Sequence, residues 1–244
     1  MLDRLTNVVT NRLRALKMGV FLGRCEGFQM PTSLVLNGKR HLLSLPKEHG
    51  VRIAFMELLL TDVYQLEQVS RPVRTVLDIG ANVGLFCLAA RHVFPEATIH
   101  AYEPNPHLEA FLKVQAETAS CRYFMEAVAA EDGKVNLTLE EDSVLTRSER
   151  SDAGDIPAVA FRKVIERIGG SVDLLKLDCE GAEWELFEDE DAWENIRNVS
   201  MEYHLWPNHT HEEARSVVQK LGFKVQTQRP ADGFGLLRAT RLEH

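Results

Sequence analysis

The stretch "VLDIGANVGLF", residues 76–86, places two glycines, an acid and an asparagine between two apolar runs. The apolar residues around Asp78 suit a buried parallel strand, and those from Leu85 to Phe94 recur at helical spacing until Pro95. We therefore predict a tight turn from a strand into a helix. Glycines in such a turn let the backbone approach a ligand at the helix N-terminus. The alternative is a turn whose glycines serve packing alone.

Two nucleotide ligands compete for this turn. Dinucleotide sites use G-x-G-x-x-G, and that template fails here because Asn82 and Leu85 stand where it needs glycines. The chain has D-x-G-x-x-x-G instead, with Asp78 at the strand end. A carboxylate there would repel a pyrophosphate, and it would attract a ligand that carries an ammonium and a sulfonium. The turn therefore predicts S-adenosylmethionine rather than NAD.

Composition limits the classes of protein and partner. A chain of 244 residues fits one α/β domain with an appended segment, and its net charge of −8 argues against a nucleic-acid partner. The apolar runs fall short of the roughly 18 residues of a membrane span. Four cysteines without CxxC spacing suit a reducing compartment. We expect a cytoplasmic protein without a transmembrane segment.

From residue 73 onward, strands alternate with helices, which predicts a doubly wound, mostly parallel sheet. The last two strands, 223–229 and 233–241, flank an Asp-Gly turn and are expected to close the sheet as an antiparallel pair. Residues 140–157 are polar and are expected to form a loop. The expected strands are 73–79, 98–104, 121–130, a strand ending near Asp178, and 198–206, and the expected helices include 83–94, 159–169, 182–189 and 211–221, the last with a Thr210–Glu213 capping box.

The N-terminal part is expected to be an extension over residues 1–71. Residues 1–22 form a basic amphipathic helix, which can pack on its own domain, on a second copy of the chain or on a membrane. A hairpin at 33–45, through Asn37-Gly38, and a helix at 49–69 follow. We expect this extension to be a cap or an oligomer contact, in the second case the contact of a homodimer. The main domain is expected at 72–241, and 242–244 resembles a tag remnant.

Acids gather at the strand ends, where an α/β sheet collects its ligands. Glu103 stands 25 residues after Asp78, at the end of the second strand, where a carboxylate can accept from both ribose hydroxyls of an adenosine. Asp178 and Glu180 fall in the turn of "LLKLDCEGAEWELF", residues 174–187. They are candidates to orient the cofactor, to act as a base, or to hold a divalent ion with Glu202 and His204; we expect no metal.

Five segments carry a resemblance to a known family: "VLDIGANVGLF", "AYEPNP", "EAVAAEDGKVNL", "DLLKLDCEGAE" and "MEYH". In this order and spacing, over roughly residues 73–205, the chain resembles the FkbM methyltransferases. The resemblance implies a class I methyltransferase fold with a seven-stranded sheet, S-adenosylmethionine as the methyl donor, and hydroxyl acceptors on sugars and polyketide-type products. The cofactor-binding set it implies is Asp78, Gly80, Ala81, Asn82, Gly84, Glu103, Pro104, Asn105, Glu126, Ala127 and Asp178.

The function expected from these residues is O-methylation of a small-molecule or glycan hydroxyl. Asp178, Glu180 and His204 are the candidate bases, and Glu202 is expected to support them. His204 is attractive because the pKa of imidazole lies near neutral pH. The alternative is a cofactor-binding assembly partner of the same fold whose catalytic edge has degenerated.

Overall fold

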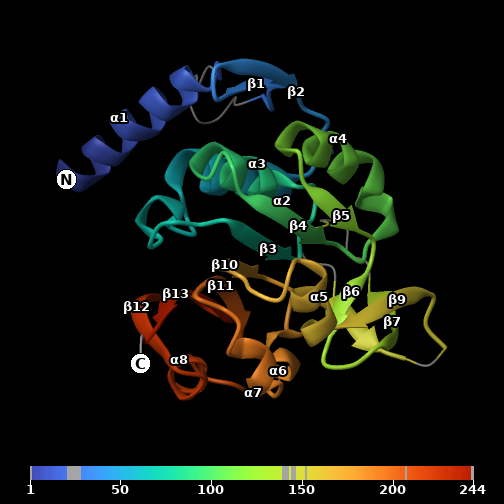
Figure 1. The fold of residues 1–244 in the computed structure, drawn as a ribbon. Coiled ribbons are helices and arrows are strands. Elements are labelled where there is room, and N and C mark those ends of the chain that lie inside the picture. The colour runs from blue at the N-terminus through green and yellow to red at the C-terminus, as the bar shows by residue number, and fades with distance from the viewer. Residues whose placement is uncertain are drawn as a thin grey trace.

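A seven-stranded sheet forms the centre of the protein in a computed structural model (Figure 1). The structure describes residues 2–20, 29–138, 143, 147–151, 153–206 and 208–242, and for residues 2–9 and 147–150 it describes the backbone alone. The strand order is β12-β13-β11-β10-β3-β4-β5. β13 is antiparallel to both neighbours, and the pairs from β11 to β5 are parallel, as predicted. The strands are β3 (Thr75–Ile79), β4 (Thr98–Tyr102), β5 (Arg122–Phe124), β10 (Leu174–Leu177), β11 (Asn198–His204), β12 (Phe223–Pro230) and β13 (Phe234–Arg241).

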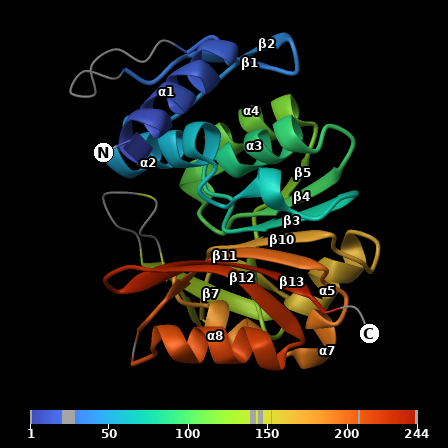
Figure 2. The ribbon, with the colours of Figure 1, turned by 90° about the vertical axis from the view of Figure 1, so that its left-hand side faces the viewer.

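Helices cover both faces of this sheet, with α1 to α4 on one face and α5 to α8 on the other (Figure 2). Successive strand residues point to opposite faces, so Val76 joins one apolar core and Leu77 joins the other. The predicted capping box of α8 is present at Thr210 and Glu213. The helices are α1 (Leu2–Lys17), α2 (His49–Phe55), α3 (Leu85–Val93), α4 (Glu109–Ala119), α5 (Phe161–Arg167), α6 (Glu183–Leu186), α7 (Glu190–Trp193) and α8 (His211–Lys220), with a short 3₁₀ turn η4 (Pro106–Leu108) before α4.

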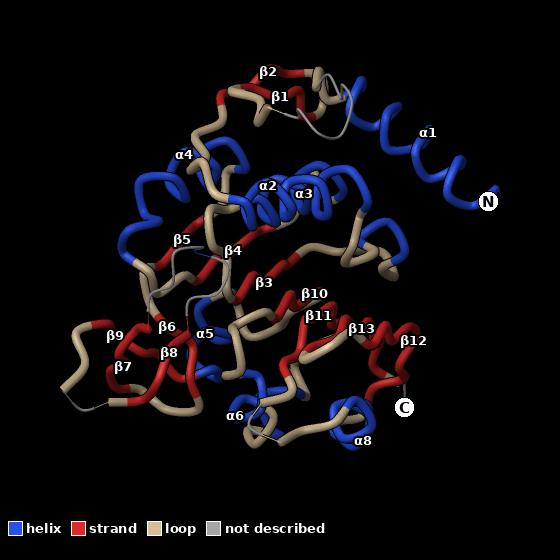
Figure 3. Tube along the Cα trace, turned by 180° about the vertical axis from the view of Figure 1, so that it is seen from behind, coloured by secondary structure: helices blue, strands red, loops and turns tan. Residues whose placement is uncertain are grey.

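A second sheet departs from the prediction of one strand at 121–130 and a loop at 140–157. The chain leaves the main sheet after β5, and β6 (Ala127–Ala129) pairs with β9 (Ile156–Ala160). β7 (Gly133–Thr138) pairs with both β9 and β8 (Arg147–Arg150). Figure 3 shows this sheet to one side of the main sheet. Residues 140–142, 144–146 and 152 of the expected loop lie outside the described residues.

The N-terminal segment contains the predicted hairpin, in which β1 (Ser33–Leu36) pairs antiparallel with β2 (Lys39–Leu42). The single helix expected at 49–69 is wrong, because α2 passes into a π-helix, η2 (Met56–Thr61), and a separate 3₁₀ turn, η3 (Leu66–Gln68), follows. The break is at Asp62, which adopts a left-handed φ of 51° and accepts the backbone N–H groups of residues 66 and 67 through its carboxylate.

This segment shares the core of the main domain. Ala15, Leu34 and Phe55 are buried in the same apolar cluster as Val76 and Leu85. The side chain of Arg14 ties α1 to the segment after α2, because it donates to the carbonyl of Leu60 at 3.1 Å and pairs with Glu67 at 2.6 Å.

Within the described residues, no helix combines the length and the apolar character needed to cross a bilayer. Of the expected tag remnant at 242–244, only Leu242 lies in the described part of the chain.

Candidate active site

A cavity of about 410 Å³ lies at the carboxyl ends of β3, β4, β10 and β11. Its volume is typical of a small-molecule site. The turns after these strands form one side, and residues between Gly50 and Tyr64 of the N-terminal segment form another. Of the residues predicted for the site, Gly80, Ala81, Asn82, Glu103, Pro104, Glu126, Ala127, Asp178, Glu180, Glu202 and His204 line the cavity, while Asp78, Gly84 and Asn105, all of them described, lie outside its lining.

The glycine turn after β3 is shaped by protein packing. Gly80 has a φ of 78°, and a Cβ there would lie 1.7 Å from the backbone oxygen of Asp178. A Cβ at Gly84 would lie 3.0 Å from side-chain atoms of Leu112 and Gln115. A Cβ at Gly80 would therefore meet protein atoms, which favours packing as the reason for this glycine. The residue is glycine because the turn after β3 presses against the end of β10.

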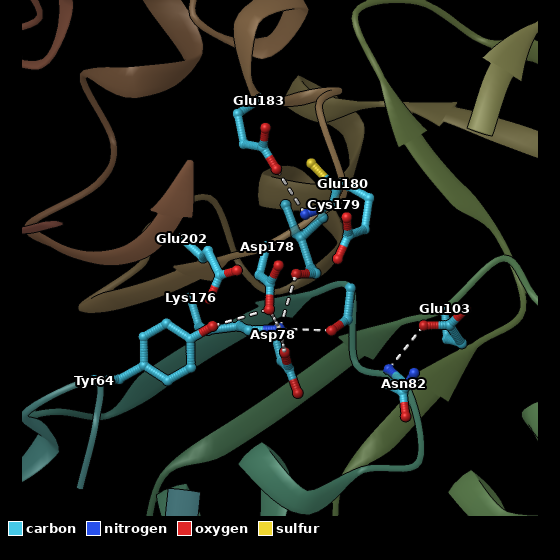
Figure 4. Close-up of polar contacts among 12 residues, drawn as sticks. Tyr64, Asp78, Asn82, Glu103, Lys176, Asp178, Cys179, Glu180, Glu183 and Glu202 are labelled. Carbon is cyan, nitrogen blue, oxygen red and sulfur yellow. Dashed lines mark hydrogen bonds and ion pairs between the residues drawn. The ribbon is translucent and has the colours of Figure 1, made fainter. Parts of the chain in front are cut away.

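Glu103 fixes the turn and faces the cavity (Figure 4). Its Oε2 accepts the backbone N–H of Asn82 at 2.7 Å, and its Oε1 accepts that of Asn105 at 2.9 Å. Each carboxylate oxygen can accept a second hydrogen bond, so the pair remains available for two ligand hydroxyls. Burial raises the pKa of Glu103 to about 7, against the lowering effect of the two N–H groups.

Asp78 lies beneath the cavity rather than in its wall. Its carboxylate is fully buried, Oδ1 lies 3.3 Å from Lys176 Nζ, and Cys87 Sγ donates to Oδ2 at 3.4 Å. Burial raises the pKa of Asp78, and the Lys176 ammonium opposes that rise. Asp78 is thus held in an internal ion pair, and its predicted contact with the cofactor stays a prediction.

Lys176 links the ends of β3 and β10. Besides Asp78, its Nζ lies 3.6 Å from Asp178 Oδ2 and donates to the carbonyl oxygens of Gly80 at 2.5 Å and Ile79 at 3.3 Å. Burial lowers the pKa of Lys176, but the surrounding carboxylates outweigh it and hold the pKa above its usual range. Sequence reasoning missed this residue, although a lysine inside the apolar run "LLKL" was a signal.

Asp178 receives a second partner from the N-terminal segment. The hydroxyl of Tyr64 donates to Asp178 Oδ2 at 2.9 Å, as Figure 4 shows. Tyr64 is held in place because the Ser200 hydroxyl donates to its backbone oxygen at 3.0 Å and its ring packs edge-on against Phe86 at 5.7 Å. Sequence reasoning also missed Tyr64, since it follows an irregular helix with no motif around it.

His204 sits among three carboxylates. Its Nδ1 lies 3.3 Å from Glu183 Oε1, and its Nε2 lies 3.3 Å from Glu180 Oε2 and 3.6 Å from Glu202 Oε1. Glu183 lies at the start of the expected helix 182–189 and does begin α6, but its side chain is fully buried and also accepts the backbone N–H of Cys179 at 2.9 Å.

These contacts change the protonation expected of His204. Burial lowers the pKa of His204, but the hydrogen bonds and charges of Glu183, Glu202 and Glu180 raise it to about 11. His204 therefore holds its proton at neutral pH and cannot accept another. This raised pKa argues against a neutral imidazole base at His204, whose catalytic role stays a prediction. Burial also raises the pKa of Glu180 to about 8 and that of Glu202 above its ordinary value.

Asp178, Glu180 and His204 each place one potential ligand atom within 4.8 Å of the others. A divalent ion between them would have to displace the proton of His204 Nε2, which now faces Glu180 and Glu202.

The lining fits S-adenosylmethionine on two observations. Glu103 offers two buried carboxylate oxygens to a ribose diol. Asp178, Glu180 and Glu202 give the other end of the cavity an acidic wall that suits an ammonium and a sulfonium. Glu126, which also lines the cavity, is held by Arg167 at 2.6 Å.

Comparisons with known proteins agree with this geometry. The profile of the methyltransferase FkbM domain matches residues 78–225. Methyltransferase sdnD of Sordaria araneosa is 28% identical over 214 residues, which cover 68% of this chain and 81% of that protein. The 31-O-demethyl-FK506 methyltransferase FkbM of Streptomyces tacrolimicus is 35% identical over 102 residues, which cover 41% of this chain and 37% of that protein.

Solved structures are also similar. M. capricolum TrmK in complex with S-adenosyl-homocysteine has a TM-score of 0.46 and 8% identity, covering 77% of this chain and 70% of that chain. Aeropyrum pernix fibrillarin with natively bound S-adenosyl-L-methionine has a TM-score of 0.46 and 10% identity, covering 70% of this chain and 68% of that chain. Since the family profile spans more than half of the sequence, the chain belongs to the FkbM methyltransferase family and is an S-adenosylmethionine-dependent methyltransferase of the class I fold.

Proposed function

We propose that this methyltransferase methylates a hydroxyl oxygen of a sugar, a glycan or a natural product, with Asp178 accepting the hydroxyl proton. The observation that carries the proposal is the setting of Asp178. It lines the cavity after β10, and its Oδ2 is fixed by the Tyr64 hydroxyl and by Lys176. The name of the Streptomyces relative, 31-O-demethyl-FK506 methyltransferase, supports oxygen as the methylated atom.

S-adenosylmethionine, when bound, supplies a methyl group that its sulfonium makes electrophilic. The chain must align an acceptor hydroxyl with that methyl group, and alignment of this kind contributes on the order of 7–11 kcal/mol. It must also remove the hydroxyl proton as the oxygen gives electron density to the methyl group. General-base catalysis of this kind raises the rate roughly 10²–10⁴-fold. Asp178 suits this task because, among the residues that the structure describes, both fixing contacts are made by Oδ2, which leaves Oδ1 to accept from the hydroxyl.

The neighbouring acids have a supporting role in this proposal. His204 is an imidazolium that draws Glu180 and Glu202 to the same side of the cavity. The carboxyl oxygens of these two residues accept hydrogen bonds from further acceptor hydroxyls or from the ammonium of the methyl donor. Glu180 has a left-handed φ of 53°, and strained backbone of this kind is often found where side chains serve a site.

The N-terminal extension caps the cavity in this proposal. Ile53, Ala54, Leu58 and Val63 line it opposite the strand ends and give the acceptor site an apolar wall. An acceptor with an apolar body and a hydroxyl directed at Asp178 fits between the two sides. We therefore treat residues 1–71 as part of the substrate site and 72–241 as the domain that binds the methyl donor.

The experiment compares turnover and binding in matched variants. The protein is incubated with S-adenosylmethionine and a panel of sugar and polyketide-type hydroxyl compounds, and formation of S-adenosylhomocysteine and methylated product is followed by mass spectrometry. Asp178→Asn should lower turnover by roughly 10²–10⁴-fold while calorimetry shows unchanged affinity for S-adenosylhomocysteine. Asp191→Asn, in the exposed part of α7, serves as the control.

Two outcomes would contradict the proposal. Full activity in Asp178→Asn would show that another group removes the proton. Binding of the methyl donor without turnover of any panel compound, while a partner protein gains activity when this chain is added, would favour the assembly partner.

A further inference from the structure

Helix α1 carries an apolar face that points away from the domain. Leu13 and Leu16 are 57% and 70% exposed, whereas Ala15 and Met18, on the opposite side, are buried in the core. The exposed side chains of Arg12 and Lys17 flank the two leucines along the helix. An exposed leucine pair between basic residues is typical of a helix that lies in a membrane interface.

The same end of the molecule is basic, although the protein is acidic. Residues 10–20 and 29–47 contain six Lys or Arg and no Asp or Glu, while the whole chain has a net charge of −8. The hairpin adds Lys39 and Arg40, both exposed, beside the end of α1. The backbone N–H of Val35 in β1 donates to the carbonyl of Met18 at 2.7 Å, which fixes hairpin and helix together.

This basic end is also one continuous edge of the molecule. Figures 1 and 2 show α1 and the β1–β2 hairpin together at the edge farthest from α7 and α8. We define the docking face as Arg12, Leu13, Leu16, Lys17, Lys39 and Arg40.

We propose that the docking face binds the surface of an anionic lipid bilayer, with Leu13 and Leu16 entering the headgroup region. The alternative occupant is a second copy of the chain. A two-fold dimer through this face would place the same basic patch of both copies against each other, and facing like charges oppose association. Anionic headgroups complement the charge instead, since each Lys or Arg near such a surface favours binding. Charge thus selects the lipid surface.

The proposal also sets how the methyltransferase would sit on the bilayer. The side chain of Arg14, on α1, donates a hydrogen bond to the carbonyl of Leu60 in η2, and η2 supplies Glu57 and Leu58 to the cavity lining. Docking of α1 would therefore hold the cavity wall close to the headgroups. The binding itself requires no turnover and stands apart from the proposed reaction.

The test measures binding of the full chain to vesicles by co-sedimentation. Vesicles of phosphatidylcholine alone are compared with vesicles of phosphatidylcholine and phosphatidylglycerol in equal parts. We expect binding to the anionic vesicles only. Raising the salt from about 0.1 M to about 1 M shortens the screening length from about 10 Å to about 3 Å, so this binding should be lost at high salt.

Matched variants separate charge, apolar contact and fold. Arg12→Glu with Lys17→Glu should weaken binding by at least about tenfold, and Leu13→Ser with Leu16→Ser should weaken it at unchanged charge. Arg215→Glu with Lys220→Glu is the control, because it reverses two exposed charges at the same spacing on α8, at the opposite edge. Leu242→Ser, 51% exposed, controls for loss of a surface leucine. Circular dichroism checks that each variant is folded.

Some results would overturn the inference. Absence of binding to the anionic vesicles would do so, as would equal binding by the docking-face variants and the α8 variant. Sedimentation velocity on the free protein tests whether a second copy occupies the docking face instead. The face would be assigned to a second copy if the protein self-associates, if Leu13→Ser with Leu16→Ser abolishes that self-association, and if no vesicle binding is seen.

Discussion

The hydroxyl of Tyr64 donates a hydrogen bond of 2.9 Å to Oδ2 of Asp178, although the two residues are 114 positions apart in the chain. Tyr64 belongs to the N-terminal segment, and Asp178 follows the central strand β10. The bond therefore joins the cap to the carboxylate that we propose as the base.

Tyr64→Phe removes this bond and keeps the ring that packs on Phe86. A hydrogen bond to a charged group contributes about 1.5–3 kcal/mol, so we expect kcat to fall roughly tenfold to a hundredfold. Affinity for S-adenosylhomocysteine, measured by calorimetry, should stay unchanged. Tyr123→Phe is the control, because the Tyr123 hydroxyl makes a long contact of 3.5 Å with Glu109 and Tyr123 is not among the residues that line the cavity. Equal loss in both variants would point to a general effect on folding.

Gly80→Ala tests whether the glycine turn is set by packing. The new Cβ would meet the backbone oxygen of Asp178 at 1.7 Å, and the φ of 78° is strained for any other residue. We expect the free energy of unfolding to fall by about 3 kcal/mol, measured in urea. Gly133→Ala is the control, because a Cβ there would have no atom within 4 Å. A variant as stable as the wild type that only loses cofactor affinity would restore the ligand-space explanation.

Glu103→Gln tests the proposed ribose contact. The amide keeps the shape of the side chain but replaces one acceptor with a donor, so affinity for S-adenosylhomocysteine should fall by about 1–3 kcal/mol. Because the pKa of Glu103 is raised to about 7, its carboxyl group is protonated below that pH and ionised above it. Wild-type affinity should therefore increase as the pH rises through 7.

The Glu103→Gln variant separates the titration of Glu103 from titration of the ligand. In Glu103→Gln the increase near pH 7 should disappear, whereas Glu117→Gln, at an exposed position of α4, should retain it. The same pH dependence in the wild type and in Glu103→Gln would show that the ligand or another residue titrates.

Much of the main sheet could be predicted because its strands are short apolar runs that end in polar turns. Parallel strands bring their carboxyl ends to one edge, so Glu103, Asp178, Glu180 and Glu202 meet as expected. The second sheet was missed because residues 121–130 form one continuous β-like run. Its division between β5 and β6 depends on pairing with β9, a contact between distant segments.

The polar core of the site was harder to predict. Lys176 stands in a buried strand only because Asp78, Asp178 and two carbonyl oxygens surround it. The protonation of His204 was hard to foresee for a similar reason, since it depends on Glu183, which lies at the start of the expected helix 182–189. A side chain's protonation follows from neighbours that spacing along the chain does not reveal.

The pKa values of His204 and Glu180 predict that stability falls as the pH rises. The pKa of His204 is about 11 in the folded protein and near 6.5 otherwise, so the folded state binds more protons between these values. Glu180 acts in the same direction between 4.5 and about 8. Stability falls with rising pH wherever the folded state binds more protons than the unfolded state. It should therefore decline from near-neutral to alkaline pH.

Urea unfolding at a series of pH values from about 6 to about 9 measures this decline, to which His204 contributes at most about 1.4 kcal/mol per pH unit. His204→Gln should be less stable near neutral pH, because Glu183 and its neighbours lose their cation, and its stability should depend less on pH. His107→Gln is the control at an exposed position. If the slopes of His204→Gln and the wild type coincide, His204 is not an imidazolium in the folded protein, and it becomes a candidate base again.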